Sequence, residues 1–135
     1  MAPIKQGDVV IVYTGHGNYW GKDWDSLSPE QKAKNLQIFN SGAPGLGITS
    51  CRYLSSLKIA MVGSDTFGTE AIPGEDQNRP IDCHIEWIVK HSINIFENLD
   101  VSQLIEDKVY EFMFVFAPLK MKGATGSPGN PISIY

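Results

Sequence analysis

Apolar, β-branched runs recur along the chain between segments rich in turn residues, a pattern typical of strands that alternate with helices. The clearest run is DVVIVYT at 8–14, between two glycines. Because this run is continuous rather than alternating, we expect a strand covered on both faces. The segment VYEFMFVFA at 109–117 predicts the strongest strand. Strands are expected at 8–14, 60–63, 93–96, 109–117 and 132–135.

The clearest helix start is Ser28-Pro29-Glu30-Gln31, where Ser28 can cap, Pro29 fits the first helical position and Gln31 completes a capping box. This helix should end near Asn40. Further helices are expected at about 49–56, 82–91 and 100–106. The segment 67–80 is expected to be a long surface loop, and 15–25 and 123–131 are also expected to be loops. The order of elements predicts a mixed α/β fold in one domain spanning 1–135.

Composition narrows the classes of protein. The chain has 135 residues, with 11 Lys and Arg against 15 Asp and Glu, so its net charge is −4. An acidic chain without a basic run argues against nucleic-acid binding. No apolar run is long enough to span a membrane, and no signal peptide is recognisable, so the expected compartment is the cytoplasm. The two cysteines, Cys51 and Cys83, are expected to be core or half-buried thiols.

The region around the 82–91 helix contains candidate metal ligands or acid/base groups. His84, Trp87, Ile88 and His91 are predicted to share one helix stripe. Two turns separate the histidines by about 10 Å, too far for one metal ion. Glu97 follows the 93–96 strand, where its carboxylate could return toward the 82–91 helix. The alternative is an ordinary helix-face histidine satisfied by a hydrogen bond.

Other candidate residues lie on expected loops. Asp65 follows a predicted buried strand and could orient a histidine or a substrate hydroxyl, or could simply cap a turn. His16 lies between two glycines and could act as an acid/base group, or could be a solvated histidine.

A second group of loop residues could contact a ligand. Trp20 and Trp24 could form the wall of a pocket for a flat ligand, or cover the edge of a core. Thr125 and Ser127 could bind an anion, or turn the chain. The P-loop, GxGxxG, HExxH and GxSxG motifs are all missing from the sequence.

Four stretches in the same order resemble the cyclase family that includes kynurenine formamidase and isatin hydrolase. They are GDVVIVYTG, PGLGITSCRYLSSLKIAMVGSDTFGTE, the segment from Pro80 to Leu99 that holds His84 and ENL, and FAPLKMKGATGSP. The resemblance is to the carboxyl-terminal portion of that family. It implies a partial or truncated version of a swivelling β/β/α fold.

The resemblance implies a metal-dependent hydrolase of amides or lactams, with Zn or Mn as possible cofactor. By position, His84 and Glu97 resemble the late His and Glu of the family's metal site. Asp65 and Thr66 match its "DT" segment, taken as structural or pocket-shaping, and Trp20 and Trp24 match pocket aromatics. The family's His-x-Gly-Thr-His-x-Asp signature, which supplies most of the ligands, is absent from this sequence.

These observations favour an enzyme that acts on a small cyclic or carbonyl-bearing metabolite, by hydrolysis or by a related cyclisation or dehydration. The expected catalytic set is His84 and Glu97 as metal ligands or base, Asp65 as orienter and His16 as an outside candidate. The alternative is a non-catalytic binding or assembly subunit, or half of a split hydrolase. Two strongly apolar strands cannot both stay uncovered in a soluble chain, which predicts a homo-oligomer or a complementary amino-terminal half.

Overall fold

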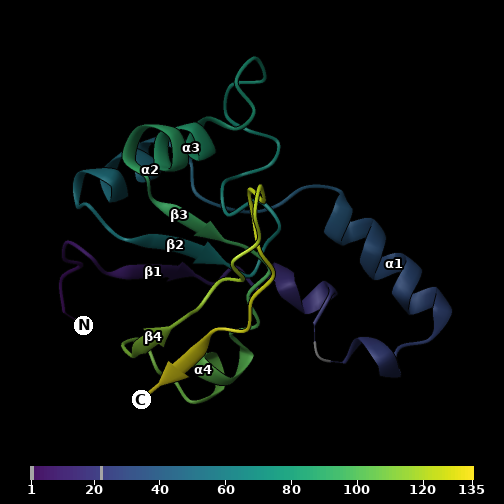
Figure 1. Cartoon of the computed structure of the whole chain (residues 1–135). Helices are drawn as coiled ribbons and strands as arrows, with labels where there is room; N and C mark the ends of the chain where they lie inside the picture. Colours follow the sequence, from purple (N-terminus) through teal and green to yellow (C-terminus); the bar gives the residue numbers. More distant parts are fainter. Residues whose placement is uncertain (1, 22) are drawn as a thin grey trace. The chain divides into compact units, whose positions relative to one another are not determined.

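The computed structural model describes residues 2–21 and 23–135, which form two compact units, 2–101 and 102–135. The first unit contains a three-stranded parallel sheet in the order β1-β2-β3 (Figure 1). Its strands are β1 (Val9–Val12), β2 (Met61–Ser64) and β3 (Asn94–Phe96). The second unit contains α4 (Ser102–Glu106) and an antiparallel pair, β4 (Met113–Val115) with β5 (Ile132–Ile134). The mixed α/β prediction is therefore confirmed.

The helices of the first unit begin where local signals place them. α1 (Pro29–Asn40) starts with a complete capping box, in which Ser28 accepts from the Gln31 backbone and the Gln31 side chain accepts from the Ser28 backbone. α2 (Ile48–Ser56) follows the Pro-Gly-Leu-Gly break. The expected loop at 15–25 contains two short 3-10 helices, η1 (His16–Tyr19) and η2 (Trp24–Ser26).

The core of the first unit lies between the sheet and the helices α2 and α3 (Asp82–His84), which cover one side of the sheet in Figure 1. Trp87 and Val62 are fully buried there. The four residues of β1 are only half-buried, so the prediction of a strand covered on both faces is wrong. β1 is also an edge strand of the described sheet, with β2 as its one partner there.

The predicted helix at 82–91 has a different winding. Its first part is α3, and its second part, η3 (Ile85–Lys90), is a π-helix. A π-helix has more residues per turn than an α-helix, so positions spaced for an α-helix no longer share one face. Ile88 is accordingly 50% exposed although Trp87 is buried, and the predicted stripe is wrong at this position.

The two cysteines form a disulfide rather than free thiols, so that prediction is wrong. The Cα atoms of Cys51 and Cys83 are 5.6 Å apart, and both residues are fully buried. The bond joins α2 to α3 across 32 residues of sequence. The spacing of the cysteines could not predict this pairing, because α2 and α3 come together only when both pack on the same side of the sheet (Figure 1).

The expected strand at 109–117 and the expected surface loop at 67–80 are each correct over only part of their length. The 109–117 run forms a strand over three residues only, β4. The loop at 67–80 is not a surface loop throughout, because Thr69 and Glu70 are buried. Isolated bridges pair Leu46 with Glu70 and Ala43 with Ile72, and these bridges hold the first part of the loop inside the first unit.

The pair β4–β5 presents apolar side chains to the exterior. Met113 lies opposite Ile134 and Val115 opposite Ile132, so the four share one face of the ribbon. All four are exposed. The homo-oligomer that would cover such a face stays a prediction. No helix among the described residues is long and apolar enough to cross a membrane.

Candidate functional site

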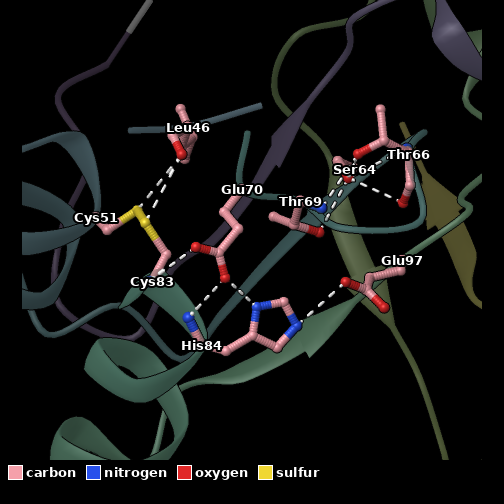
Figure 2. Close-up of polar contacts among 9 residues, drawn as sticks. All are labelled: Leu46, Cys51, Ser64, Thr66, Thr69, Glu70, Cys83, His84 and Glu97. Carbon is pink, nitrogen blue, oxygen red and sulfur yellow. Dashed lines mark hydrogen bonds and ion pairs between the residues drawn. A yellow bond between two sulfur atoms is a disulfide. The ribbon is translucent and has the colours of Figure 1, made fainter. Parts of the chain in front are cut away.

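The loop that follows β2 is held by a buried network of hydroxyl groups, shown in Figure 2. The Ser64 Oγ lies 2.9 Å from Thr66 Oγ1 and 3.0 Å from Thr69 Oγ1. The Thr69 N–H in turn donates to Thr66 Oγ1 at 3.1 Å. All three side chains are fully buried. The network therefore fixes the path of the chain up to Glu70, the next residue.

Glu70 reaches from this loop to the first turn of α3. One carboxylate oxygen, Oε2, accepts from the Cys83 N–H at 3.0 Å. The other, Oε1, accepts from the His84 N–H at 3.1 Å and also contacts His84 Nδ1. Glu70 is 3% exposed, so this carboxylate has exchanged water for three protein partners.

The other ring nitrogen of His84 faces Glu97, which directly follows β3 (Figure 2). The His84 Nε2 and Glu97 Oε1 atoms form an ion pair at 3.4 Å. That oxygen is buried and has no hydrogen-bond partner among the described residues. The segments that follow the adjacent parallel strands β2 and β3 thus supply one carboxylate to each side of the same imidazole.

The charge around His84 favours its protonated form. Glu97 and Glu70 raise the pKa of His84 above its ordinary value of 6.5, with Glu97 as the larger cause, and burial of the ring opposes them. The His84 side chain is 28% exposed, so solvent reaches it in part. In the absence of another cation, a proton on the ring balances the two carboxylates.

The spacing of Nε2 and Oε1 suits a shared divalent cation. Two ligand atoms of one tetrahedral zinc ion, bound at about 2.1 Å each, lie about 3.4 Å apart. The measured separation is 3.4 Å, and the Glu97 oxygen lacks another hydrogen-bond partner among the described residues. The donor types, an imidazole nitrogen and a carboxylate oxygen, are ones that zinc and manganese accept. In residues 2–21 and 23–135, however, no group of three potential ligands gathers at one place.

Asp65 lies on the same loop as Glu70 but makes different contacts. Its Oδ1 accepts from the Thr14 N–H and the Thr14 hydroxyl, both at 2.8 Å. Its Oδ2 accepts from the Gly17 N–H at 3.2 Å. Asp65 therefore holds the segment after β1, while His84 is contacted by Glu70 and Glu97. The predicted partner Thr66 belongs to the buried hydroxyl network.

The aromatic residues predicted to form a pocket wall gather around Phe39 at the end of α1. The ring of His16 stacks on Phe39 with centroids 5.2 Å apart, and its Nε2 lies 3.2 Å from the Phe39 carbonyl. Trp20 packs against Trp24 at 5.4 Å and against Phe39 at 6.1 Å. Trp20 is 53% exposed, so this cluster offers an accessible aromatic surface.

Thr125 and Ser127 lie in the second unit, 102–135. The Ser127 hydroxyl accepts from the Leu119 N–H at 2.9 Å and donates to the Pro128 carbonyl at 2.7 Å. These contacts stabilise the turn that contains Ser127. Thr125 is exposed in the same segment.

Sequence reasoning brought His84 and Glu97 together but missed Glu70, Ser64 and Thr69. No local pattern marks Glu70, since it stands in a Gly- and Pro-containing segment that resembles a surface loop. The available signal was its position five residues after Asp65, on a loop at the carboxyl end of a predicted strand. Loops at such an edge commonly carry functional side chains.

The fold and this histidine–carboxylate arrangement define an α/β protein with a paired donor site at the carboxyl ends of parallel strands. Comparison with known proteins identifies the family. The model described as "Putative cyclase" matches residues 1–71, more than half of the 135 residues, so the chain belongs to this cyclase family. The predicted resemblance to the family is confirmed. Among curated proteins, none matches the chain.

Two solved structures share the fold. One is described as the crystal structure of a novel cyclase, and it is 25% identical with a TM-score of 0.75 over 99% of this chain and 41% of that chain. The other is described as a potential metal-dependent hydrolase with cyclase activity. It is 22% identical with a TM-score of 0.62, over 98% of this chain and 53% of that chain. The chain therefore spans about half or less of the length of these two proteins.

Proposed function

We propose that the chain contributes His84 and Glu97 as two ligands of a divalent metal site in a cyclase-family hydrolase. The observation that carries the proposal is the 3.4 Å separation of His84 Nε2 and Glu97 Oε1, together with the lack of a hydrogen-bond partner for that buried oxygen among the described residues. Family membership and the solved relative described as a potential metal-dependent hydrolase support the same reading. The remaining donors come from outside this pair, either from another polypeptide segment or from water.

The proposed substrate is a small cyclic or carbonyl-bearing metabolite whose amide, lactam or lactone bond is hydrolysed. A zinc or manganese ion held by His84 and Glu97 would supply Lewis-acid polarisation of the carbonyl. His84 contributes a neutral imidazole nitrogen, and Glu97 contributes a carboxylate that balances the charge of the cation. Glu70 holds the imidazole from its other side.

The second candidate function is a non-catalytic binding or assembly subunit. The observation that favours it is that the described residues offer a pair of donors rather than a group of three. A subunit of this kind would bind metal or metabolite without converting it. Metal binding and turnover must therefore be measured separately.

The test is elemental metal analysis of the purified chain, dialysed without chelator, next to His84→Ala and to the control variant His91→Gln. We expect about one zinc or manganese per chain in the unaltered protein and the control, and a loss of at least tenfold in His84→Ala. A screen of formamides, lactams and lactones then tests hydrolysis. Metal content that is equal in all three proteins, or absent from all three, contradicts the proposed metal site. Metal binding with no turnover of any substrate class favours the binding subunit.

A further inference from the structure

His84 lies between two carboxylates that compete for the proton of its neutral ring. If Nδ1 carries the proton, Nε2 presents a lone pair to Glu97, and if Nε2 carries it, no lone pair is available on that side. The two tautomers therefore give the site opposite properties. Only the first leaves Nε2 able to bind a cation.

We propose that Glu70 is a positioning residue that keeps the proton of neutral His84 on Nδ1 and so leaves the Nε2 lone pair facing Glu97. The inference deepens the proposed function, and its consequence for metal binding rests on that function. Its statement about the tautomer stands independently of any metal.

The contact geometry on the two sides of the ring is unequal. Glu70 Oε1 makes a close hydrogen bond with Nδ1. Glu97 Oε1 lies 3.4 Å from Nε2, beyond the usual range of about 2.7–3.2 Å for an N–H donor and an oxygen acceptor. The longer Glu97 contact therefore favours the proton on Nδ1 in the neutral ring. The larger effect of Glu97 on the pKa of His84 concerns the charged ring, in which both nitrogens carry a proton.

Glu70 is also the better fixed of the two carboxylates. Its side chain is 4% exposed, against 31% for Glu97. It receives the backbone N–H groups of Cys83 and His84 as well as the ring contact, so it binds both the ring and the backbone of the same histidine. Cys83 is itself tied to α2 by the disulfide.

The backbone before Glu70 is held in a conformation that its sequence disfavours. Thr69 has a φ of 52°, in the left-handed region that a β-branched residue rarely occupies. The Thr69 hydroxyl and N–H are both engaged by the Ser64–Thr66 network. Strain of this kind persists only where surrounding contacts enforce it, and it is common at functional sites. The next residue, Glu70, contacts the first turn of α3.

A carboxylate that fixes the second nitrogen of a metal-binding histidine is a common device in metal sites, and its loss typically weakens metal affinity by about 10–100-fold. Glu70 has the chemistry and the geometry for this role. Because Glu70 also satisfies two backbone donors, a loss of stability alone would not distinguish positioning from a structural role. The test therefore reads the tautomer directly.

The first experiment is ¹⁵N NMR of histidine-labelled, chelator-treated protein, at a pH where the imidazole is neutral. The His84 signals are identified with a His84→Gln variant. We expect a protonated Nδ1 and an unprotonated Nε2. A protonated Nε2 in the unaltered protein overturns the proposal, whatever the variants do.

The second experiment uses Glu70→Leu, which removes the acceptor at similar size, with Asp65→Asn as a control at an equally buried carboxylate. We expect the Nε2-protonated form of His84 to become the major tautomer in Glu70→Leu and to remain minor in Asp65→Asn. An unchanged tautomer in folded Glu70→Leu contradicts the proposal. If Glu70→Leu does not fold, the proposal is tested by the His84 tautomer in the spectrum of the unaltered protein.

Titration of the same proteins with zinc separates this inference from the proposed function. We expect Glu70→Leu to bind zinc about 10–100-fold more weakly than the unaltered chain. If the tautomer shifts as predicted but no protein binds zinc, the proposed metal site fails and the positioning role stands. If zinc binds equally well to Glu70→Leu and the unaltered chain, the positioning role in metal binding is wrong.

Discussion

Asp65 and Glu70 are two buried carboxylates on one loop, and they illustrate two uses of a buried charge. Each is 3% exposed, and each accepts three hydrogen bonds. All the donors to Asp65 are backbone N–H groups or a hydroxyl of the segment after β1. One donor to Glu70 is instead a titratable ring, which is part-exposed and faces a second carboxylate.

The difference shows that burial does not by itself identify a functional carboxylate. Asp65 accepts only from groups that do not ionise, and these groups all belong to the segment after β1. Glu70 contacts one nitrogen of the His84 ring, and the other nitrogen of that ring contacts Glu97. The His84 side chain is partly exposed to solvent. The type of donor separates the two residues where the exposed fraction does not.

The largest expected effect comes from removing the disulfide. This bond joins α2 to Cys83, whose N–H donates to Glu70. Replacing both Cys51 and Cys83 by alanine should lower the free energy of unfolding by about 3–4 kcal/mol, the entropic value for closing a loop of this length. Denaturant unfolding monitored by circular dichroism measures the change. The amide signal of His84 should move, while those of Thr14 and Gly17 should not. Shifts of equal size at His84 and at Thr14 and Gly17 would contradict the separation between the contacts of Glu70 and those of Asp65.

Asp65→Asn should have an intermediate effect. The amide offers one acceptor oxygen where the carboxylate offered two, so the Gly17 N–H or the Thr14 donors lose a partner. The expected loss is about 1–3 kcal/mol of unfolding free energy. Thermal unfolding checks the value, and the exchange rates of the Thr14 and Gly17 amide protons locate the loss. Stability equal to that of the unaltered chain would show that Asp65 does not hold the segment after β1.

The smallest expected effect is a pH dependence of stability that arises from His84. Its pKa is raised in the folded protein, chiefly by Glu97, so the folded state binds this proton more tightly than the unfolded state. The resulting stabilisation is fully present below the ordinary pKa of 6.5 and is lost as the pH rises through the raised value. Metal-free protein should therefore become less stable over that interval.

Two variants check the origin of this pH dependence. In His84→Gln the decline should disappear, and in His91→Gln it should remain. Urea unfolding at a series of pH values, with chelator present, provides the measurement. A decline of the same size in His84→Gln would assign the effect to another group.

Much of the fold could be predicted from local signals. The capping box at Ser28 placed the start of α1, and the β-branched run at 8–14 placed β1. The extent of β4 and the π-helical winding of η3 could not be predicted, because both depend on tertiary packing that outweighs local propensity. The disulfide was missed for a similar reason, since Cys51 and Cys83 meet only after α2 and α3 pack together.

The candidate site shows the same limit. His84 and Glu97 were paired on the resemblance to the family and on the position of Glu97 at the end of a strand. Their partner Glu70 was not found, because its burial depends on contacts made by Leu46 and by α3, which are distant in sequence. Asp65 follows the same strand, and its sequence position did not reveal that its donors would come from the β1 side.

The most direct test of the central claim is a calorimetric titration of zinc into the unaltered chain, Glu97→Gln and Glu106→Gln. Glu97→Gln keeps the size of the side chain but removes the charge that the cation needs, and Glu106 is an exposed glutamate in the other unit. The account predicts about one zinc per chain for the unaltered protein and Glu106→Gln, and at least tenfold weaker binding for Glu97→Gln. Equal affinity in all three proteins, or no binding in any, would contradict the claim that His84 and Glu97 form a metal site.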